Sequence, residues 1–159
     1  MAEVYKHAIF MRLGANTGSG LSGLHTVREY QIFLAQHGEA WFPLTTGMSE
    51  RYRCEFADAI DYHYALELYL SVVGKEAALD YVAEVAAIAT GKARIPTPDE
   101  ELTPEPWRGD LRGTWLKIRS LKPATLTAGD FTVINTGARL SDVLSGGKYH
   151  FGYVKRVGE

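Results

Sequence analysis

One ten-residue segment limits the folds open to this chain more than any other. In YALELYLSVV, residues 64–73, an apolar side chain recurs at every second position from Leu66 to Val72, with polar or aromatic residues between. A period of two places successive side chains on opposite faces of a β-strand. The segment therefore predicts a strand with one face against a hydrophobic core, so the chain needs a sheet.

Other segments carry similar strand signals. They are runs of aromatic and β-branched residues bounded by glycine or proline, which favour strands. We expect these strands at residues 4–13, 39–44, 50–57, 114–121, 130–136 and 148–157, with a turn or helical stub around 138–144.

Two segments have the apolar spacing of a helix. TVREYQIFLAQH, residues 26–37, places its apolar side chains on one side and is followed by Gly38, the residue favoured just after a helix end. Thr26 and Glu29 have the spacing of a capping box, which predicts that this helix starts at Thr26. KEAALDYVAEVAAIAT, residues 75–90, predicts the second helix.

The order of these elements indicates the fold class. Strands and helices do not alternate regularly, which argues against a doubly wound parallel sheet. We expect an α+β fold, with a small, strongly curved mixed sheet or open barrel of about six to seven strands and two main helices packed on it. Residues 93–110 hold four of the six prolines and a run of acids, and are expected to form an exposed excursion or a lid without regular structure.

Composition is that of an ordinary globular protein. The 159 residues are 46% apolar and 23% charged, which fits one domain spanning residues 1–159, since domains run to roughly 100–200 residues. Cys54 is the only cysteine, so no intramolecular disulfide is possible and a cytoplasmic location is expected. No window approaches the ~20 apolar residues of a membrane helix, and Lys6 and Arg12 interrupt the short apolar run near the N-terminus, so we expect neither membrane spanning nor secretion.

Charge is unevenly distributed along the chain. The net charge of −2 gives no general support for non-specific nucleic-acid binding. Residues 1–106 carry 8 Lys and Arg against 15 Asp and Glu, whereas residues 107–159 carry 9 against 4. The basic C-terminal third indicates either a face for anionic ligands or simply uneven charge on a small protein.

Two late strands combine aromatic and cationic side chains. Strand 114–121 places Trp115, Lys117 and Arg119 on one face, and strand 148–157 places Tyr153 and Lys155 on one face. An aromatic ring with cations two residues away can stack on a base and neutralise a phosphate. The alternative is that these aromatics belong to the core and these cations to solvent.

A glycine-rich segment, residues 14–23, follows the first strand and precedes the first helix. Backbone N–H groups in that position can hold an anion, with Gly18, Gly20 and Ser22 as candidate residues. The P-loop motif is absent, because no Gly-Lys-Ser/Thr occurs there. A simple connector between the two elements would have the same sequence.

Signals for metal binding and catalysis are weak. Asp61, His63 and Glu67 share a side if they lie on a strand, but no second histidine stands at ligand spacing. No Gly-x-Ser-x-Gly motif exists, and Cys54 is expected to be an inert thiol. We therefore expect no cofactor, no metal and no catalytic residue.

Three short motifs resemble a known superfamily. They are AIFMRL with GLSGL, the Gly-Glu-Ala-Trp-Phe strand after the first helix, and TWLKIRSLKPA. Together they look like the PUA-like superfamily, nearest to EVE and ASCH domains. The resemblance implies a small curved barrel whose aromatic pocket recognises nucleic acids or modified bases, with Trp41 and Trp115 bordering it. The chain departs from that pattern in the glycine-rich segment and in residues 93–110.

The leading hypothesis is a non-catalytic module that binds a nucleotide, or a modified or flipped base in nucleic acid. Trp41, Trp115 and Tyr153 are the stacking candidates, and Arg12, Lys117 and Arg119 are the anion partners. One alternative is a small RNase-like enzyme of the ASCH type that uses His63 or His150 with a lysine. The other is a protein-interaction adaptor or an oligomeric ligand-sequestering protein, in which the acidic 93–110 segment meets a partner chain or a second copy, giving a homodimer.

Overall fold

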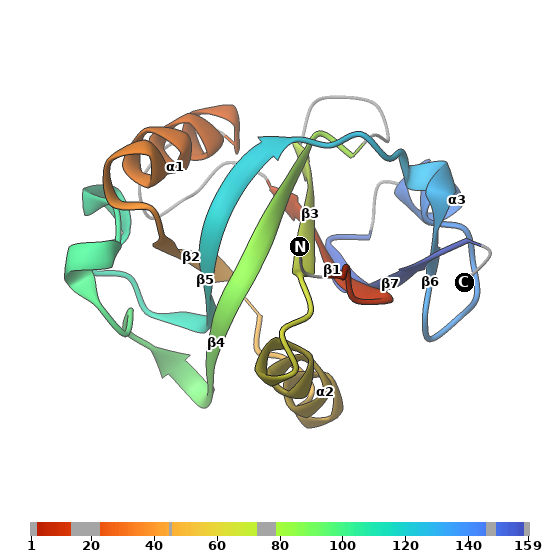
Figure 1. The fold of residues 1–159 in the computed structure, drawn as a ribbon, viewed down its shortest axis with the longest axis horizontal. Coiled ribbons are helices and arrows are strands. Elements are labelled where there is room, and N and C mark those ends of the chain that lie inside the picture. The colour runs from red at the N-terminus through yellow and green to blue at the C-terminus, as the bar shows by residue number, and fades with distance from the viewer. Residues whose placement is uncertain (1–2, 14–22, 45, 73–78, 146–148, 158–159) are drawn as a thin grey trace.

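The fold is built on one seven-stranded sheet, shown in Figure 1. The computed structural model describes residues 3–13, 23–44, 46–72, 79–145 and 149–157. The strands are β1 (His7–Leu13), β2 (Ala40–Leu44), β3 (Leu66–Val72), β4 (Tyr81–Ile95), β5 (Arg112–Pro123), β6 (Phe131–Val133) and β7 (Phe151–Arg156). Their order in the sheet is β2-β5-β4-β3-β1-β7-β6, with β1 and β3 parallel and every other pair antiparallel. The α+β class and the mixed sheet expected from the sequence are confirmed.

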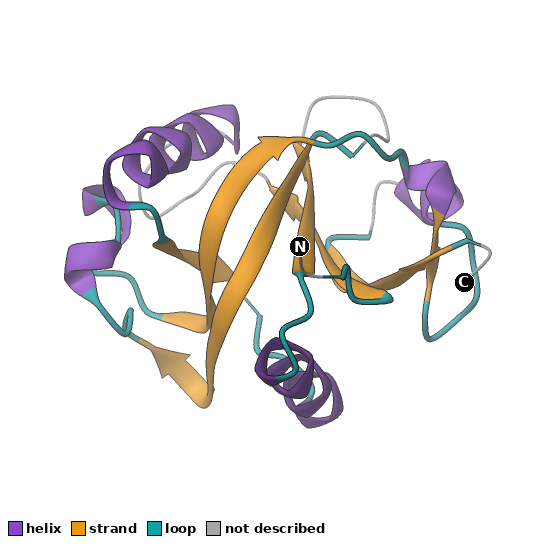
Figure 2. Ribbon diagram, in the orientation of Figure 1, coloured by secondary structure: helices purple, strands orange, loops and turns teal. Residues whose placement is uncertain are grey.

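Three α-helices lie around the sheet, as Figure 2 shows for the described part of the chain. They are α1 (Gly23–His37), α2 (Glu50–Asp61) and the short α3 (Leu140–Ser145), with 3-10 turns η1 (Glu100–Leu102), η2 (Glu105–Trp107) and η3 (Ala128–Asp130). The sheet is open, since β2 and β6 are its two edges. None of the helices among the described residues is long and apolar enough to cross a membrane.

The central strands are buried on both faces. Along β1, Ile9 belongs to one hydrophobic core, and its neighbour Phe10, which points to the opposite face, belongs to another. In β3, Leu68 and Tyr69 divide between the two cores in the same way. The face of β3 that was expected to be core is buried, and the opposite face is largely buried as well. The second core forms because β6, η3 and α3 cover the other face with apolar side chains.

Residues 50–57 form helix α2, and the predicted strand there was wrong. The Ser49 hydroxyl accepts a hydrogen bond from the Tyr52 N–H at 3.4 Å and so caps the helix. Tyr52, Phe56 and Ala59 are its buried residues, a helical spacing of four and three. The strand prediction gave too much weight to the β-propensity of tyrosine and phenylalanine.

The helix predicted at residues 75–90 was also wrong, because β4 begins at Tyr81. Residues 75–78 lie outside the described part of the chain. The alanine-rich stretch pairs with β3 on one side and β5 on the other, and these ladders override the helix preference of alanine. Val82 belongs to one core, and Ala83 and Val85 belong to the other, so both faces of the strand carry apolar residues. Apolar residues so closely spaced also fit the period of a helix.

The other local expectations had mixed outcomes. Helix α1 begins at Gly23, so Thr26 lies inside it and the capping box was wrong. Gly38 does end the helix, with φ +83° and its N–H donating to the Leu34 carbonyl at 2.8 Å. The stub near residues 138–144 is α3.

Residues 93–110 are more ordered than expected. Strand β4 extends to Ile95, and η1 and η2 follow it. Thr97 and Thr103 share a buried hydrogen bond of 2.6 Å. Trp107 is fully buried, with its ring centroid 5.0 Å from that of Tyr30 in α1. This excursion, residues 96–110, is therefore anchored to α1 rather than loose.

Gly113 provides a test of how α2 is positioned. A Cβ atom on Gly113 would lie 2.5 Å from the carbonyl carbon of Thr46 and 2.6 Å from the nitrogen of Gly47, both backbone atoms that lead into α2. We expect Gly113→Ala to lower the free energy of unfolding by about 1–3 kcal/mol through overpacking. Gly109→Ala is the matched control, since nothing lies within 4 Å of the place its methyl group would take. Urea denaturation followed by fluorescence measures both; equal effects would contradict the close approach.

Candidate functional site

The predicted stacking residue Trp115 lies inside the core. Its side chain is 0% exposed, and its indole N–H donates to the Ile95 carbonyl at 2.9 Å. No ligand can reach a face of this ring without repacking of the core around it.

Trp41 and Lys117, two of the predicted ligand residues, lie side by side. They face each other across the β2–β5 pair, and the Lys117 Nζ lies 5.7 Å from the Trp41 ring centroid. The same Nζ lies 3.5 Å from an oxygen of Glu39. Trp41 is only 8% exposed, so little of its ring is accessible to a ligand.

Tyr153 also has its ring covered. The ring stacks on that of Tyr52 in α2, with centroids 3.9 Å apart and planes at 19°. Its hydroxyl accepts a hydrogen bond from the Ser49 N–H at 3.3 Å. Burial raises the pKa of Tyr52, whose hydroxyl donates to Asn135 at 3.3 Å. Together these contacts hold α2 against β7.

Arg12 lies apart from the other predicted anion partners. It is partly buried, and its Nη2 donates to the Leu144 carbonyl in α3 at 3.3 Å. Its Nε is buried without a hydrogen-bond partner among the described residues. The predicted anion residues Gly18, Gly20 and Ser22 lie outside that part of the chain.

Arg119 differs from the other predicted residues because its side chain is 60% exposed. The pairing of β4 with β5 shifts register here: Ser120 pairs with Glu84 and Ile118 with Val85, which leaves Arg119 as an extra residue. Such a β-bulge redirects a side chain and is common beside functional sites. Arg119 therefore has no partner in the β4–β5 ladder, and its side chain faces solvent.

The end of α2 lies beside this bulge. The Tyr64 N–H donates to the Ala59 carbonyl and the His63 N–H to the Ile60 carbonyl, each at 3.0 Å, which is a Schellman motif. The motif requires a left-handed residue, and His63 adopts φ 65° there. Glycine is favoured in that position, so histidine costs stability. A strained residue retained at the surface is a reason to look for a function.

Two adjoining hollows open between α2, β3 and the bulge, with volumes of about 200 and 280 Å³. Both are bordered by Ala65 and Glu84, and we call them together the bulge groove. Its lining residues are Val4, Ile60, His63, Tyr64, Ala65, Glu67, Val82, Ala83, Glu84, Val85, Ala86, Arg119, Ser120 and Lys122.

The aromatic side of the groove is firmly supported. Tyr64 is 39% exposed, and the adjacent Tyr62 is 78% exposed. The Tyr64 ring packs edge-on against Tyr5, with centroids 5.4 Å apart. Burial, and then a hydrogen bond to Glu55, raise the pKa of Tyr5 to about 12, so this phenol stays neutral at physiological pH.

Two carboxylates, Glu67 and Glu84, line the charged side of the groove, and Glu67 has the closer partners. Glu67 accepts from Arg156 at 2.8 Å and from the Tyr69 hydroxyl at 2.9 Å. Glu84 lies 3.4 Å from Arg119, but both side chains are more than a third exposed. Exposed ion pairs contribute little stability. Arg119 can therefore exchange Glu84 for an anionic ligand at low cost.

Metal ligation at the groove finds no support among the described residues. In the part of the chain that the structure describes, no three His, Cys, Asp or Glu side chains are placed to hold a metal ion. Asp61, His63 and Glu67, which a strand would have put on one side, are separated because the helix ends between them.

Comparisons of the chain with models of protein families, with characterised proteins and with solved structures found no match. Function is therefore inferred from the chemistry of the bulge groove.

Substitution of His63 tests whether its backbone is strained. We expect His63→Gly to raise the free energy of unfolding by about 0.5–1 kcal/mol, because the left-handed penalty of about 1–2 kcal/mol exceeds the entropy cost of glycine. Ala57→Gly, inside the same helix, should instead lower it by about 1 kcal/mol. Urea titrations of the two variants give opposite signs if this is correct. A less stable His63→Gly variant would mean that the imidazole makes stabilising contacts.

Proposed function

We propose that this protein is a binding module for a ligand that contains a nucleobase, either a nucleotide or a base presented by a nucleic acid, and that the bulge groove is its site. The observation that carries the proposal is the exposed Arg119 guanidinium opening onto the same hollow as Tyr64 and His63. The proposed function is the one expected from the sequence. Of the predicted stacking and anion-binding residues, Arg119 lines the bulge groove, and the others that the structure describes do not.

In this proposal the base stacks on the aromatic side of the groove. Tyr64 and His63 both line the smaller hollow, and both side chains are exposed. Stacking of a base on an aromatic side chain contributes about 1–3 kcal/mol. Because the Tyr64 ring already packs against the ring of Tyr5, ordering it costs less entropy on binding.

The phosphate is bound at the opposite side by the cations of β5. Arg119 presents a planar guanidinium that can donate two parallel hydrogen bonds to phosphate oxygens. Lys122 is exposed and lines the adjoining hollow, where it adds a second positive charge. Both residues belong to the basic C-terminal third of the sequence.

Polar groups between these two sides match the edge of a base. Glu84 borders both hollows and can accept a hydrogen bond from an exocyclic amino group once Arg119 has moved to a phosphate. The Ser120 hydroxyl also lines the groove. Taken together, the hollows lie within the roughly 300–1,000 Å³ typical of small-molecule sites.

Calorimetric titration with the four ribonucleoside monophosphates tests the proposal. We expect at least one to bind, and both Arg119→Ser and Tyr64→Ala to weaken its affinity by about 5- to 150-fold, the equivalent of 1–3 kcal/mol. Arg139→Ala, which removes an arginine just before α3 and away from the groove, should leave the affinity unchanged. Undiminished binding by folded Arg119→Ser and Tyr64→Ala variants would show that the groove is not the site.

A further inference from the structure

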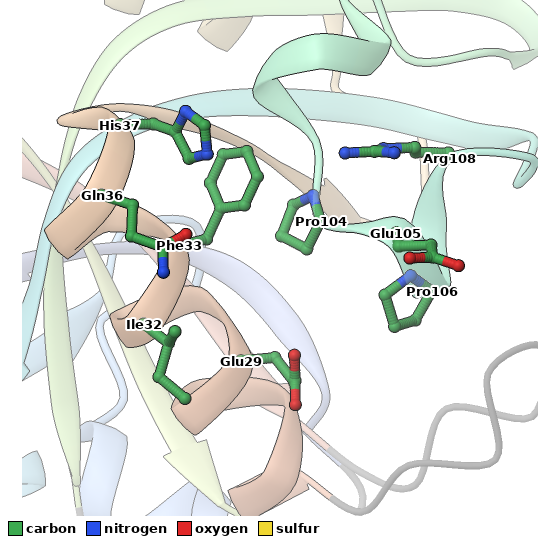
Figure 3. A pocket seen from close by; sticks show the side chains of 9 residues that line it. All are labelled: Glu29, Ile32, Phe33, Gln36, His37, Pro104, Glu105, Pro106 and Arg108. Atoms are coloured by element: carbon green, nitrogen blue, oxygen red, sulfur yellow. The ribbon is translucent and has the colours of Figure 1, made fainter.

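A second groove lies between α1 and the excursion. It encloses about 570 Å³, more than either hollow of the bulge groove. One wall is the exposed side of α1, and the other is the proline-rich part of the excursion, as Figure 3 shows. We call it the α1 groove. It contains none of the ligand residues predicted from the sequence.

The floor of the α1 groove is apolar. Ile32 is 57% exposed, so most of its side chain is open to contact. Phe33 points across the groove toward Pro104 (Figure 3), and its ring stacks on His37 with centroids 4.1 Å apart. The pyrrolidine ring of Pro106 lines the same wall as Pro104. An apolar side chain entering between these walls would be removed from water.

The rim is acidic. Glu29 projects from α1, and Glu105 lies on the opposite wall (Figure 3). Arg108 also lines the groove, on the same wall as Glu105 (Figure 3), and its Nε donates to the Thr103 carbonyl at 2.8 Å. Because two carboxylates face one guanidinium, the balance of charge favours a cation over a phosphate, so this groove does not suit the ligand proposed for the bulge groove.

Both walls are rigid before any partner binds. Trp107, directly after Pro106, is fully buried against Tyr30 of α1. Thr103, directly before Pro104, is fully buried and its hydroxyl donates to the Asp99 carbonyl at 2.7 Å. A preformed groove loses little conformational entropy on binding, which helps a short segment to bind.

We propose that the α1 groove docks a peptide segment of a partner protein in which a large apolar side chain is flanked by Lys or Arg. The apolar side chain packs on Ile32 and Phe33, and the flanking cations face Glu29 and Glu105. The groove is small, so the complex belongs to the weak, transient class of interfaces. This surface is separate from the bulge groove and does not depend on the function proposed there.

Fluorescence polarisation with a labelled acetyl-Lys-Gly-Leu-Trp-Gly-Lys amide peptide tests this docking. We expect the peptide to bind, and the same peptide with Glu in place of Lys to bind at least tenfold more weakly. Ile32→Asp and Glu105→Lys should each weaken the lysine peptide at least fivefold. Glu101→Lys is the matched control, because it makes the same charge change on the same excursion but does not line the groove.

Three results would overturn the proposal. One is binding that Ile32→Asp leaves unchanged, and another is equal weakening by Glu101→Lys and Glu105→Lys, which would indicate non-specific attraction. The third is a dimer, seen by light scattering, that Ile32→Asp abolishes, since the occupant would then be a second copy. Because Ile32 is exposed, the variant is expected to fold. Arg119→Ser should bind the peptide normally, which separates failure of this proposal from failure of the nucleotide site.

Discussion

Burial of both faces of the parallel pair β1–β3 is the constraint on which the rest of the structure depends. A parallel pair is stable only when elements cover it from both sides. On one face, α1, α2 and β2 contribute the aromatic core that includes Tyr30, Phe42 and Tyr52. On the other, η3, β6 and α3 supply Ala128, Phe131 and Leu140. The covering elements also border the two grooves: the bulge groove lies at the end of α2, and the α1 groove lies along the outer side of α1.

The two grooves differ in the balance of their charges. Glu29 and Glu105 outnumber Arg108 in the lining of the α1 groove, whereas Arg119 and Lys122 balance Glu67 and Glu84 in the bulge groove. Uneven charge along a sequence need not separate in space, because folding mixes distant segments. The acidic and basic parts of this sequence do mix, since Arg108 lies in the more acidic groove and two carboxylates line the groove that holds the cations of β5. Charge along the chain therefore indicates the character of each groove only in part.

Local patterns were sufficient for part of the fold. The alternation at Leu66–Val72 predicted β3, and the apolar stripe with Gly38 predicted most of α1. The predictions for residues 50–57 and 75–90 were wrong because the apolar patterns of these segments fit both a helix and a strand. The Ser49 cap favours the helix in the first segment, and pairing with β3 and β5 favours the strand in the second. At the candidate site, Arg119 was found from its strand, but the left-handed His63 and the hollow beside it were not. The hollow forms because the end of α2 lies beside the register shift between β4 and β5. Neither element's own sequence shows that the other lies next to it.

The two cations of β5 show why a strand-face pattern alone does not identify a binding site. Lys117 and Arg119 stand two residues apart, and regular alternation would give them the same environment. Their surroundings differ all the same: Lys117 lies opposite Trp41 and 3.5 Å from Glu39, whereas Arg119 lies outside the β4–β5 ladder, is 60% exposed and lies 3.4 Å from Glu84. An ion pair that is largely exposed contributes little stability and is easily exchanged, whereas a cation packed on a buried ring is held by more than its ion pair. Exposure and local packing, which alternation along a strand does not record, therefore distinguish the two cations.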